Sequence, residues 1–405
     1  MKWESTTIGE QCIVTSSKRV HLSERSDEGV PFYCSKEIIQ KYKGEEITEC
    51  DYIREEIYTE IAQKFGVPQE NDLLVTTRGT IGIPYLYRNT DRFYFADGNL
   101  TWMKNFKKTM LPQYLYYWFL THEGRKKVEA IAKGTAQKAV PIAGIKGLKI
   151  SLPSIAKQRQ IIGVLSAYDN FIENNQKQIK LLEEAAQRLY KEWFVDLRFP
   201  GHENTKITDG IPEGWTRCAL GDLIDFNPKV SLSKERKKQS VPMSALSTSS
   251  MTLDMAEVYT TESNAGSKFQ NGDTLLARIT PCLENGKTAF VAGIEAQEGA
   301  VGSTEFIVMR SRRLNPYMVY LLARTDDFRN SAINSMTGSD GRQRAQVDKL
   351  QALPHLEPPR EIIDTFEKNI APLFLQIRRK NEMNWHLREA RDLLLPKLMS
   401  GKIEV

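Results

Sequence analysis

The chain contains two long stretches in which apolar residues recur at a seven-residue spacing. In the first stretch one track reads Leu165, Ile172, Ile179, Ala186 and Trp193, and a second track, three residues later, reads Tyr168, Asn175, Leu182 and Leu189. This a/d pattern predicts a helix that packs along a partner helix. Residues 157–194 contain no proline and a single glycine, Gly163, so we expect this helix to be uninterrupted. Asn175 is the kind of polar residue that fixes helix register at some cost in stability.

The second stretch lies near the end of the chain and repeats the pattern less regularly. Its tracks are Ile363, Ile370, Ile377 and Leu398, then Phe366, Leu373, Leu387 and Leu394, with Lys380, Asn384 and Arg391 as interruptions. Pro372 is expected to kink this helix or to delay its start. The two helices are natural partners, and we expect them to pair antiparallel with a globular domain at each end. The alternative is that each helix packs on its own domain.

Repeated phrases indicate that the chain is an internal duplicate. The clearest pairs are LPSIAKQRQII (152–162) with LPHLEPPREII (353–363), WESTTIGE (3–10) with WTRCALGD (215–222), and DLLVTTR (72–78) with DTLLAR (273–278). They occur in the same order, which chance similarity would not preserve. The copies span roughly residues 3–199 and 215–405, and the Gly- and Pro-containing segment between them is typical of a linker.

In each copy the residues before the long helix show a mixed pattern of strands and helices. Short β-rich runs such as RFYFA (92–96) and EFIVMR (305–310) alternate with Gly, Asn and Pro turns. One helix per copy is predicted after Pro112 and after Pro316, because proline at the first helical position costs no hydrogen bond. Asn315 is interpreted as the cap of the second of these helices. The fold class is therefore α+β.

Basic residues gather in one part of the first copy. Residues 101–150 carry ten Lys and Arg against two acids, whereas residues 1–100 carry twelve basic and seventeen acidic residues. A local excess of this size favours a polyanionic partner more than the net charge of +5 does, and the alternative is a solvated helix face. No apolar run approaches the ~18 residues of a membrane span. With no apolar signal core at the N-terminus either, we expect a cytoplasmic protein that contacts no membrane.

Motifs of common catalytic sites are missing from the sequence. There is no G-x-S-x-G, no H-E-x-x-H and no paired-cysteine site. ENGKT (284–288) ends like a phosphate-binding loop, but Pro281 stands where that loop needs glycine. We therefore expect a chain that catalyses nothing alone and holds no metal or cofactor of its own.

Two related, diverged domains on a helical frame fit a target with two contact sites. DNA is the natural candidate, since half-sites on one face of a duplex lie about 34–36 Å apart per helical turn. The copies differ most before their helices, where Arg, Lys, Gln and Thr lie in turns. This predicts two domains that read two different short sequences.

Three segments resemble those of type I restriction–modification specificity subunits. LPSIAKQ to RFP (152–200), followed by GIPEGW (210–215), is similar to the central conserved region of that family. LLLPKLMSGKIEV (393–405) is similar to its second conserved region, and ARITPCLENGKTAF (277–290) to a stretch of its target-recognition domains.

The resemblance implies two tandem, pseudo-symmetric target-recognition domains, each followed by a long helix, with the helices paired as an antiparallel coiled coil. The implied organisation is target-recognition domain 1 at residues 1–156, a central spacer helix at 157–199, a linker at 200–214, target-recognition domain 2 at 215–357 and a C-terminal spacer helix at 358–405. It further implies that the chain binds double-stranded DNA and two methyltransferase subunits, which two restriction subunits can join. S-adenosylmethionine, ATP and Mg²⁺ then belong to those partners.

The candidate DNA-contacting residues lie in two loops of each copy. The first loops hold Arg78, Gly79 and Thr80, and Arg278, Ile279 and Thr280; the second loops hold Lys133, Thr135, Gln137 and Lys138, and Ser339, Arg342, Gln343 and Arg344; Lys287 is a further phosphate candidate. Arg and Gln suit bidentate contacts to guanine and adenine edges, while Lys, Thr and Ser suit phosphates.

Two other classes of function remain as alternatives. A standalone DNA-modifying enzyme such as a nuclease would need an acidic metal cluster, and the sequence shows no such pattern. A coiled-coil adaptor that binds only proteins would not need two diverged mixed domains. A gel shift at varied salt separates the adaptor from a DNA-binding protein.

Replacing Arg342 and Arg344 together by alanine should weaken binding to one half-site, because both side chains are candidates for base edges in the second domain. The sequence preference for the other half-site should stay unchanged. Binding to DNA fragments that vary one half at a time measures both effects, and unaltered affinity in the double variant would contradict the assignment.

Overall fold

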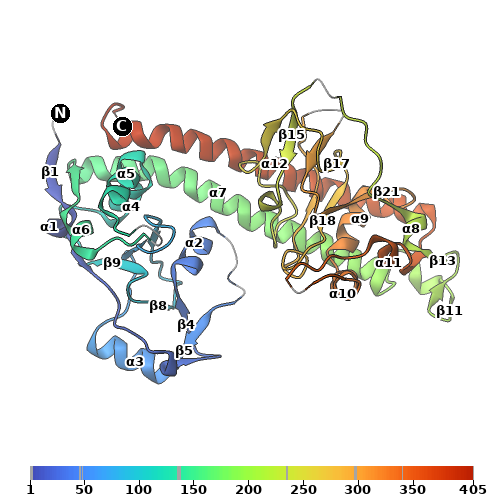
Figure 1. Ribbon diagram of the computed structural model, residues 1–405, viewed down its shortest axis with the longest axis horizontal. Coiled ribbons are helices and arrows are strands. Elements are labelled where there is room, and N and C mark those ends of the chain that lie inside the picture. The colour runs from blue at the N-terminus through green and yellow to red at the C-terminus, as the bar shows by residue number, and fades with distance from the viewer. Residues whose placement is uncertain are drawn as a thin grey trace. The chain divides into compact units, whose positions relative to one another are not determined.

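The computed structural model describes residues 3–44, 47, 49–134, 138–233, 236–295, 299–339 and 341–404. The chain divides into two compact units, Met1–Glu173 with Trp385–Val405, and Asn174–Asn384. The division passes through the long helices and not through the segment at residues 200–214. Each unit therefore contains one mixed α/β domain together with a part of each long helix (Figure 1).

The first unit is built on two four-stranded sheets, in the orders β2-β9-β6-β7 and β3-β5-β4-β8. Its strands are β1 (Glu4–Thr7), β2 (Ile13–Thr15), β3 (Arg25–Ser26), β4 (Val30–Tyr33), β5 (Asp51–Ile53), β6 (Leu73–Thr76), β7 (Pro84–Leu86), β8 (Tyr94–Phe95), β9 (Leu100–Lys104) and β10 (Lys149–Leu152). Its shorter helices are α1 (Ile8–Gln11), α2 (Ser35–Lys43), α3 (Glu55–Lys64), α4 (Pro112–Leu120), α5 (His122–Ile131) and α6 (Ile142–Gly147). A long helix, α7 (Ile155–Tyr190), follows and continues as a π turn at Lys191–Val195.

The second unit repeats this plan, with sheets in the orders β14-β21-β18-β19 and β16-β15-β20-β17. Its strands are β13 (Thr216–Ala219), β14 (Ile224–Phe226), β15 (Lys238–Val241), β16 (Tyr259–Thr261), β17 (Ser267–Phe269), β18 (Thr274–Ala277), β19 (Thr288–Phe290), β20 (Ala300–Gly302), β21 (Phe306–Ser311) and β22 (Pro354–Glu357), preceded by the small hairpin β11 (Ile207–Thr208) and β12 (Ile211–Pro212). Its helices are α8 (Leu220–Leu223), α9 (Pro316–Ala323), α10 (Asp326–Asn334), α11 (Val347–Gln351) and the long α12 (Arg360–Met399).

Local sequence signals explain the short helices at equivalent places in the two domains. Pro112 and Pro316 open α4 and α9, as predicted. The side chain of Asn315 accepts a hydrogen bond from the Met318 N–H at 2.9 Å, so it caps α9 as expected. The apolar runs at 92–96 and 305–310 contribute β8 and β21. The α+β fold with a tandem repeat is confirmed.

The phrase that repeats before each long helix does not align residue by residue in space. Thr7 pairs with Lys149 in the β1–β10 ladder, and its counterpart Ala219 pairs with Pro354 in the β13–β22 ladder. Equivalent residues here are thus 205 positions apart, four more than the phrase suggests. Leu152 ends its strand, whereas Pro354 begins its own. A shift of four residues is about one helical turn, so the same helix face stays buried.

A glycine in another repeated phrase is closely packed in both domains. A Cβ on Gly9 would lie 3.1 Å from the Lys146 carbonyl oxygen, and a Cβ on Gly221 would lie 3.3 Å from the Gln351 carbonyl oxygen. The acid that follows each glycine caps the short helix, because Glu10 accepts from the Thr7 N–H and Asp222 from the Ala219 N–H. The repeated phrase therefore encodes a helix start packed against α6 or α11.

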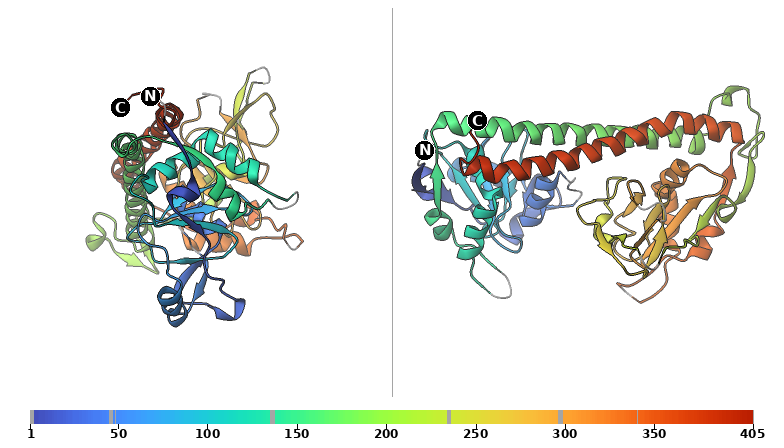
Figure 2. Two further views of the ribbon diagram at one scale, coloured as in Figure 1. Left: turned by 90° about the vertical axis from the view of Figure 1, so that its left-hand side faces the viewer. Right: turned by 90° about the horizontal axis from the view of Figure 1, so that it is seen from above.

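The long helices α7 and α12 pair antiparallel within each unit (Figure 2). In the second unit Asn175 contacts Asn384, and Trp193 contacts Phe366 with ring centroids 5.5 Å apart, so partner numbers fall as α7 proceeds. In the first unit Asp169 contacts Arg391 at 2.6 Å. The five residues of the first predicted track are all buried: Leu165, Ile172, Ile179, Ala186 and Trp193. The predicted coiled coil is confirmed, and the alternative of separate packing on each domain is wrong.

The expected effect of Pro372 on the start of the second helix is wrong. The helix begins at Arg360 and continues through Pro372 to Met399. A proline inside a helix costs about 3 kcal/mol. Phe366, Ile370 and Ile377 are fully buried on both sides of it. Each such side chain contributes about 1.5–3 kcal/mol on burial, which offsets the proline.

Asn175 and Asn384 form the polar layer of the helix pair. Asn175 Nδ2 donates to Asn384 Oδ1 at 2.9 Å, and the two residues are 6% and 1% exposed. Within the described part of the chain, Nδ2 of Asn384 is itself buried without a partner. The polar layer expected at Asn175 is present, and its proposed effect on register and stability stays a prediction.

Asn175→Leu should lower the free energy of unfolding by about 1–3 kcal/mol, because it leaves the Asn384 amide buried and unpaired. Asn175→Leu with Asn384→Leu should restore at least the original stability, since it removes both polar groups. Urea denaturation of the two variants measures the difference. Asn174→Leu, at an exposed position beside Asn175, is the matched control. Equal effects of Asn174→Leu and Asn175→Leu would contradict this interpretation.

Candidate nucleic-acid interface

The two candidate loops of each domain lie side by side at the end of a buried strand. In the first unit Arg78 and Lys133 both form isolated β-bridges with Ala139, and the Val140 N–H donates to the Thr77 carbonyl at 2.9 Å. In the second unit Ile279 and Thr337 both bridge to Arg344. The loops are about 55–65 residues apart in sequence, yet backbone hydrogen bonds join them. We call this junction the bridge site of each domain.

The elements around the bridge site connect its backbone to the central sheet. All four residues of β6 and all four of β18 are buried, and the first loop leaves directly from the end of each strand. The second loop follows α5 in one domain and α10 in the other. Side chains of the loops are therefore presented from backbone that is tied to the central sheet.

The structure corrects the predicted equivalence of Arg78 with Arg278. Asp72 caps the turn before β6 by accepting from the Gln69 N–H, and Asp273 does the same before β18. Counting from these aspartates, Arg78 is equivalent to Ile279, and Arg278 to the residue before Arg78. Successive residues of extended chain face opposite sides.

The side chains of the two arginines accordingly have different surroundings. Arg78 is exposed, whereas Arg278 is half-buried and donates from Nη2 to the Ala345 carbonyl at 3.0 Å. Its Nε is buried and has no partner among the described residues. The sequence alignment that matched Arg78 with Arg278 was therefore wrong by one residue.

The remaining candidates divide into exposed and engaged side chains. Gly79, Thr80, Lys133, Lys138, Ser339 and Arg342 are exposed. Lys287 is half-buried and donates to the Met243 carbonyl at 3.0 Å, and the carbonyl of Gln343 accepts from the Thr280 N–H. Thr135 and Gln137 lie outside the described residues.

Arg344 is held by an acid that the sequence did not single out. Its Nε lies 2.9 Å and its Nη2 2.7 Å from the two carboxylate oxygens of Glu305. The hydrogen bonds from Arg344 hold the pKa of Glu305 below its usual range. The carboxylate is thus ionised at neutral pH and keeps the guanidinium in one orientation.

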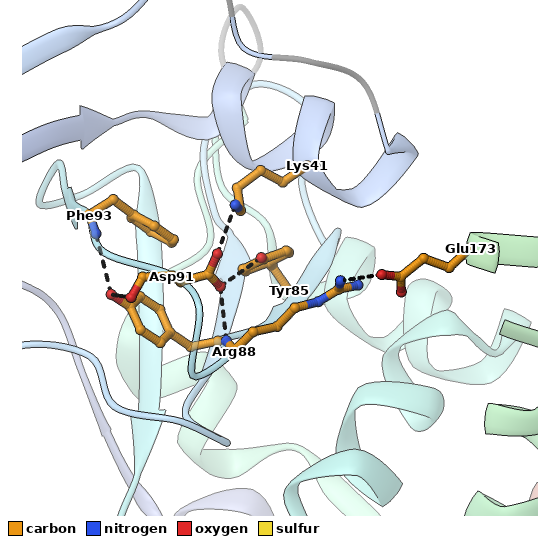
Figure 3. Close-up of polar contacts among 7 residues, drawn as sticks. Lys41, Tyr85, Arg88, Asp91, Phe93 and Glu173 are labelled. Carbon is orange, nitrogen blue, oxygen red and sulfur yellow. Dashed lines mark hydrogen bonds and ion pairs between the residues drawn. The ribbon is translucent and has the colours of Figure 1, made fainter. Parts of the chain in front are cut away.

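A buried carboxylate braces the first domain near the long helix (Figure 3). Asp91, with only 5% of its side chain exposed, accepts from the Tyr85 hydroxyl at 2.7 Å and the Arg88 N–H at 2.8 Å, and pairs with Lys41 of α2 at 2.8 Å. Arg88 then reaches Glu173 of α7 at 3.0 Å. One turn thereby connects α2, β7 and the long helix.

The second domain meets α7 through a different acid. Glu183 accepts from the Met251 N–H at 2.8 Å and from the Ser250 hydroxyl. Burial raises the pKa of Glu183 to about 7, although these hydrogen bonds and Arg324 act in the opposite direction. The two domains therefore contact the same helix by unrelated side chains.

Comparison with known proteins agrees on one family. Residues 1–184 match the family model described as the type I restriction modification DNA specificity domain. The MjaIX specificity subunit of Methanocaldococcus jannaschii is 26% identical over 82% of this chain and 78% of its own length, and the MjaVIII subunit of the same organism is 24% identical over 88% and 85%. Along most of its length the chain is thus similar to type I restriction–modification specificity subunits.

A solved structure of a specificity subunit has the same fold as this chain. The S subunit of a type I restriction–modification system from M. genitalium aligns with a TM-score of 0.55 at 14% identity, over 98% of this chain and 96% of that one. The EcoEI specificity subunit of Escherichia coli is 29% identical over 54% of this chain and 40% of its own length.

Three acids of this chain were not singled out from the sequence: Asp91, Glu183 and Glu305. Two of them have a local signal, since Glu305 directly precedes the apolar run of β21 and Glu183 directly follows a heptad position of α7. The partners of Glu305 and Glu183 lie 39 and 68 residues away in the sequence, so the roles of these two acids depended on the fold.

Two features are absent from the part of the chain that the structure describes. No three His, Cys, Asp or Glu side chains gather there in a way that could hold a metal ion. None of its helices combines the length and the apolar character that crossing a membrane requires.

The stability of the second unit should depend on pH through Glu183. Glutamate in the unfolded chain ionises near its ordinary pKa of 4.5, whereas the folded residue ionises near 7, so stability falls as pH rises between these values. Glu183→Gln should therefore stabilise the protein at pH 8 by about 2–3 kcal/mol and change little at pH 4. Urea denaturation at both pH values measures this, with exposed Glu184→Gln as control. An equal gain at the two pH values would contradict the assignment.

Proposed function

We propose that this chain is the sequence-specific DNA-binding subunit of a type I restriction–modification complex. It reads an asymmetric, bipartite target with one domain per half-site, and the paired helices set the spacer between the halves. It also serves as the scaffold for two methyltransferase subunits, which two restriction subunits can join. The family and the repeated fold support this proposal.

The observation that carries the proposal is the pair of equivalent bridge sites with unlike side chains. The first presents Arg78 opposite Ala139, and the second presents Ile279 opposite Arg344. The same backbone frame thus offers different hydrogen-bonding groups in the two domains. A protein that read two identical half-sites would not need this difference, whereas an asymmetric target requires it.

The exposed cations around the first bridge site fit a role at the phosphate backbone. Lys133 and Lys138 flank the site without an acidic partner among the described residues. Lysine is a point charge on a flexible stem, which suits phosphates more than base edges.

The chain itself is proposed to be non-catalytic and to bind no cofactor. S-adenosylmethionine, ATP and Mg²⁺ would then be held by the partner subunits, and the complex would act in the cytoplasm. The absence of catalytic motifs from the sequence supports this division of labour.

Mapping of modified adenines tests the proposed function. The chain is expressed with its own methyltransferase subunits in a host without other adenine methylation. Every modified adenine should lie in one motif with two unlike defined parts and a constant undefined spacer, and modification should vanish without the chain. A contiguous motif, or modification that persists without the chain, would refute the proposal, as would methylation or cleavage of DNA by the purified chain alone.

Lysine variants test whether the first bridge site takes part in DNA binding. Lys133→Ala with Lys138→Ala should weaken binding to all sequences alike and reduce the salt slope by about 2, since each phosphate contact contributes about 0.9. Lys108→Ala with Lys146→Ala removes two exposed charges of the same domain and is the matched control. Equal losses in the two pairs would mean that general charge, and not the bridge site, binds DNA.

A further inference from the structure

The Arg344–Glu305 pair has a geometry that leaves one edge of the guanidinium unused. The Glu305 carboxylate accepts hydrogen bonds from the Nε–H and from one Nη2–H of Arg344. Arginine has five N–H donors, so three remain on Nη1 and Nη2. The only contact of Nη1 with a described residue is the Arg342 carbonyl at 3.5 Å, and 43% of the Arg344 side chain is exposed.

We infer that Arg344 reads a guanine in the second half-site and that Glu305 is its positioning residue. The free Nη1 and Nη2 edge matches the O6 and N7 acceptors of guanine in the major groove. The inference rests on the proposed function and deepens it, since it names a base and the group that orients its reader.

Both members of the pair stand on backbone that is fixed to the sheet. The Glu305 carbonyl accepts from the Arg278 N–H at 2.9 Å, its own N–H donates to the Ser303 hydroxyl, and β21 begins at the next residue. Arg344 exchanges two backbone hydrogen bonds with Thr337. A bidentate contact requires such fixed placement, because small displacements of a side chain misalign both of its hydrogen bonds.

The acid distinguishes base reading from phosphate binding. A carboxylate beside a DNA surface repels phosphates and cancels the charge of Arg344, so it lowers general affinity for DNA. An arginine that bound phosphate would bind it less tightly because of this pairing with Glu305. An arginine that reads a base gains, because its orientation is set before DNA arrives and less conformational freedom is lost on binding.

In the first domain the arginine stands on the other of the two bridged segments. Ala139 occupies the position of Arg344, and Arg78 occupies the position of Ile279. No acidic partner for Arg78 is found among the residues that the structure describes. The two domains therefore present an arginine from different sides of a common frame, which makes them read different positions within their half-sites.

Base preference in the full complex tests the inference. The chain, purified with its methyltransferase subunits, selects sites from a duplex library randomised in both half-sites. Arg344→Lys and Glu305→Gln should each reduce the preference for guanine about tenfold at one shared position of the second half-site. Glu305→Gln should leave or raise the affinity for random DNA, and both variants should keep the first half-site profile and the wild-type unfolding midpoint.

Two controls separate the possible causes. Asp225→Asn removes the same charge from the other end of the sheet, where Asp225 pairs with Arg312, and should keep every preference. Arg78→Ala should alter only the first half-site. The proposed function itself fails if the wild-type complex selects no bipartite site. The inference alone is overturned if the wild type selects one but both variants retain its profile, or if the position they change is not a G·C pair.

Discussion

The hydrogen bond between the buried amides of Asn175 and Asn384 constrains the pairing of the long helices, because it favours one register over the others. Apolar heptad positions alone are nearly equivalent, and a slip by one heptad would still bury leucine and isoleucine. A slip would leave both amides without partners in an apolar layer, which costs more than the bond contributes. Within each unit α7 also contacts the domain, through Glu173 for Arg88 and Glu183 for Met251.

Duplication gave the molecule two copies of one backbone frame, and divergence acted on the side chains that the frame presents. The ladders that open each domain, the glycine packed against the following helix and the capped central strands recur in both. The bridge site recurs too, but its arginine has changed strands. The two different base preferences that we propose would then need changes in only a few exposed residues, since the sheet that positions them is retained.

An acid at the surface proposed to bind DNA is explained by its effect on the orientation of a neighbouring side chain, because a carboxylate does not attract DNA. Glu305 uses its carboxylate to hold the Arg344 guanidinium in place by several hydrogen bonds. Such groups reduce the general affinity for a polyanion. They are therefore better placed in a protein whose task is to distinguish sequences than in one that binds DNA indiscriminately.

Much of the fold could be predicted from the sequence, because helices and strands leave periodic patterns in neighbouring residues. The heptad of α7, the proline and asparagine that open α9, and the order of the repeats are of this kind. The family resemblance came from the same local phrases. The delayed start expected from Pro372 and the residue-by-residue alignment of the phrase at 353–363 were wrong, because burial of the whole helix face outweighs one local signal.

The candidate loops could be named from their residue types, but only the tertiary structure brought them together. Whether Arg78 corresponds to Arg278 or to Ile279 depends on a one-residue register, and side chains in extended chain reverse direction at every residue. The partner of Arg344 comes from another strand, 39 residues away. Contacts over such separations depend on how the sheets close, and no pattern among adjacent residues records that.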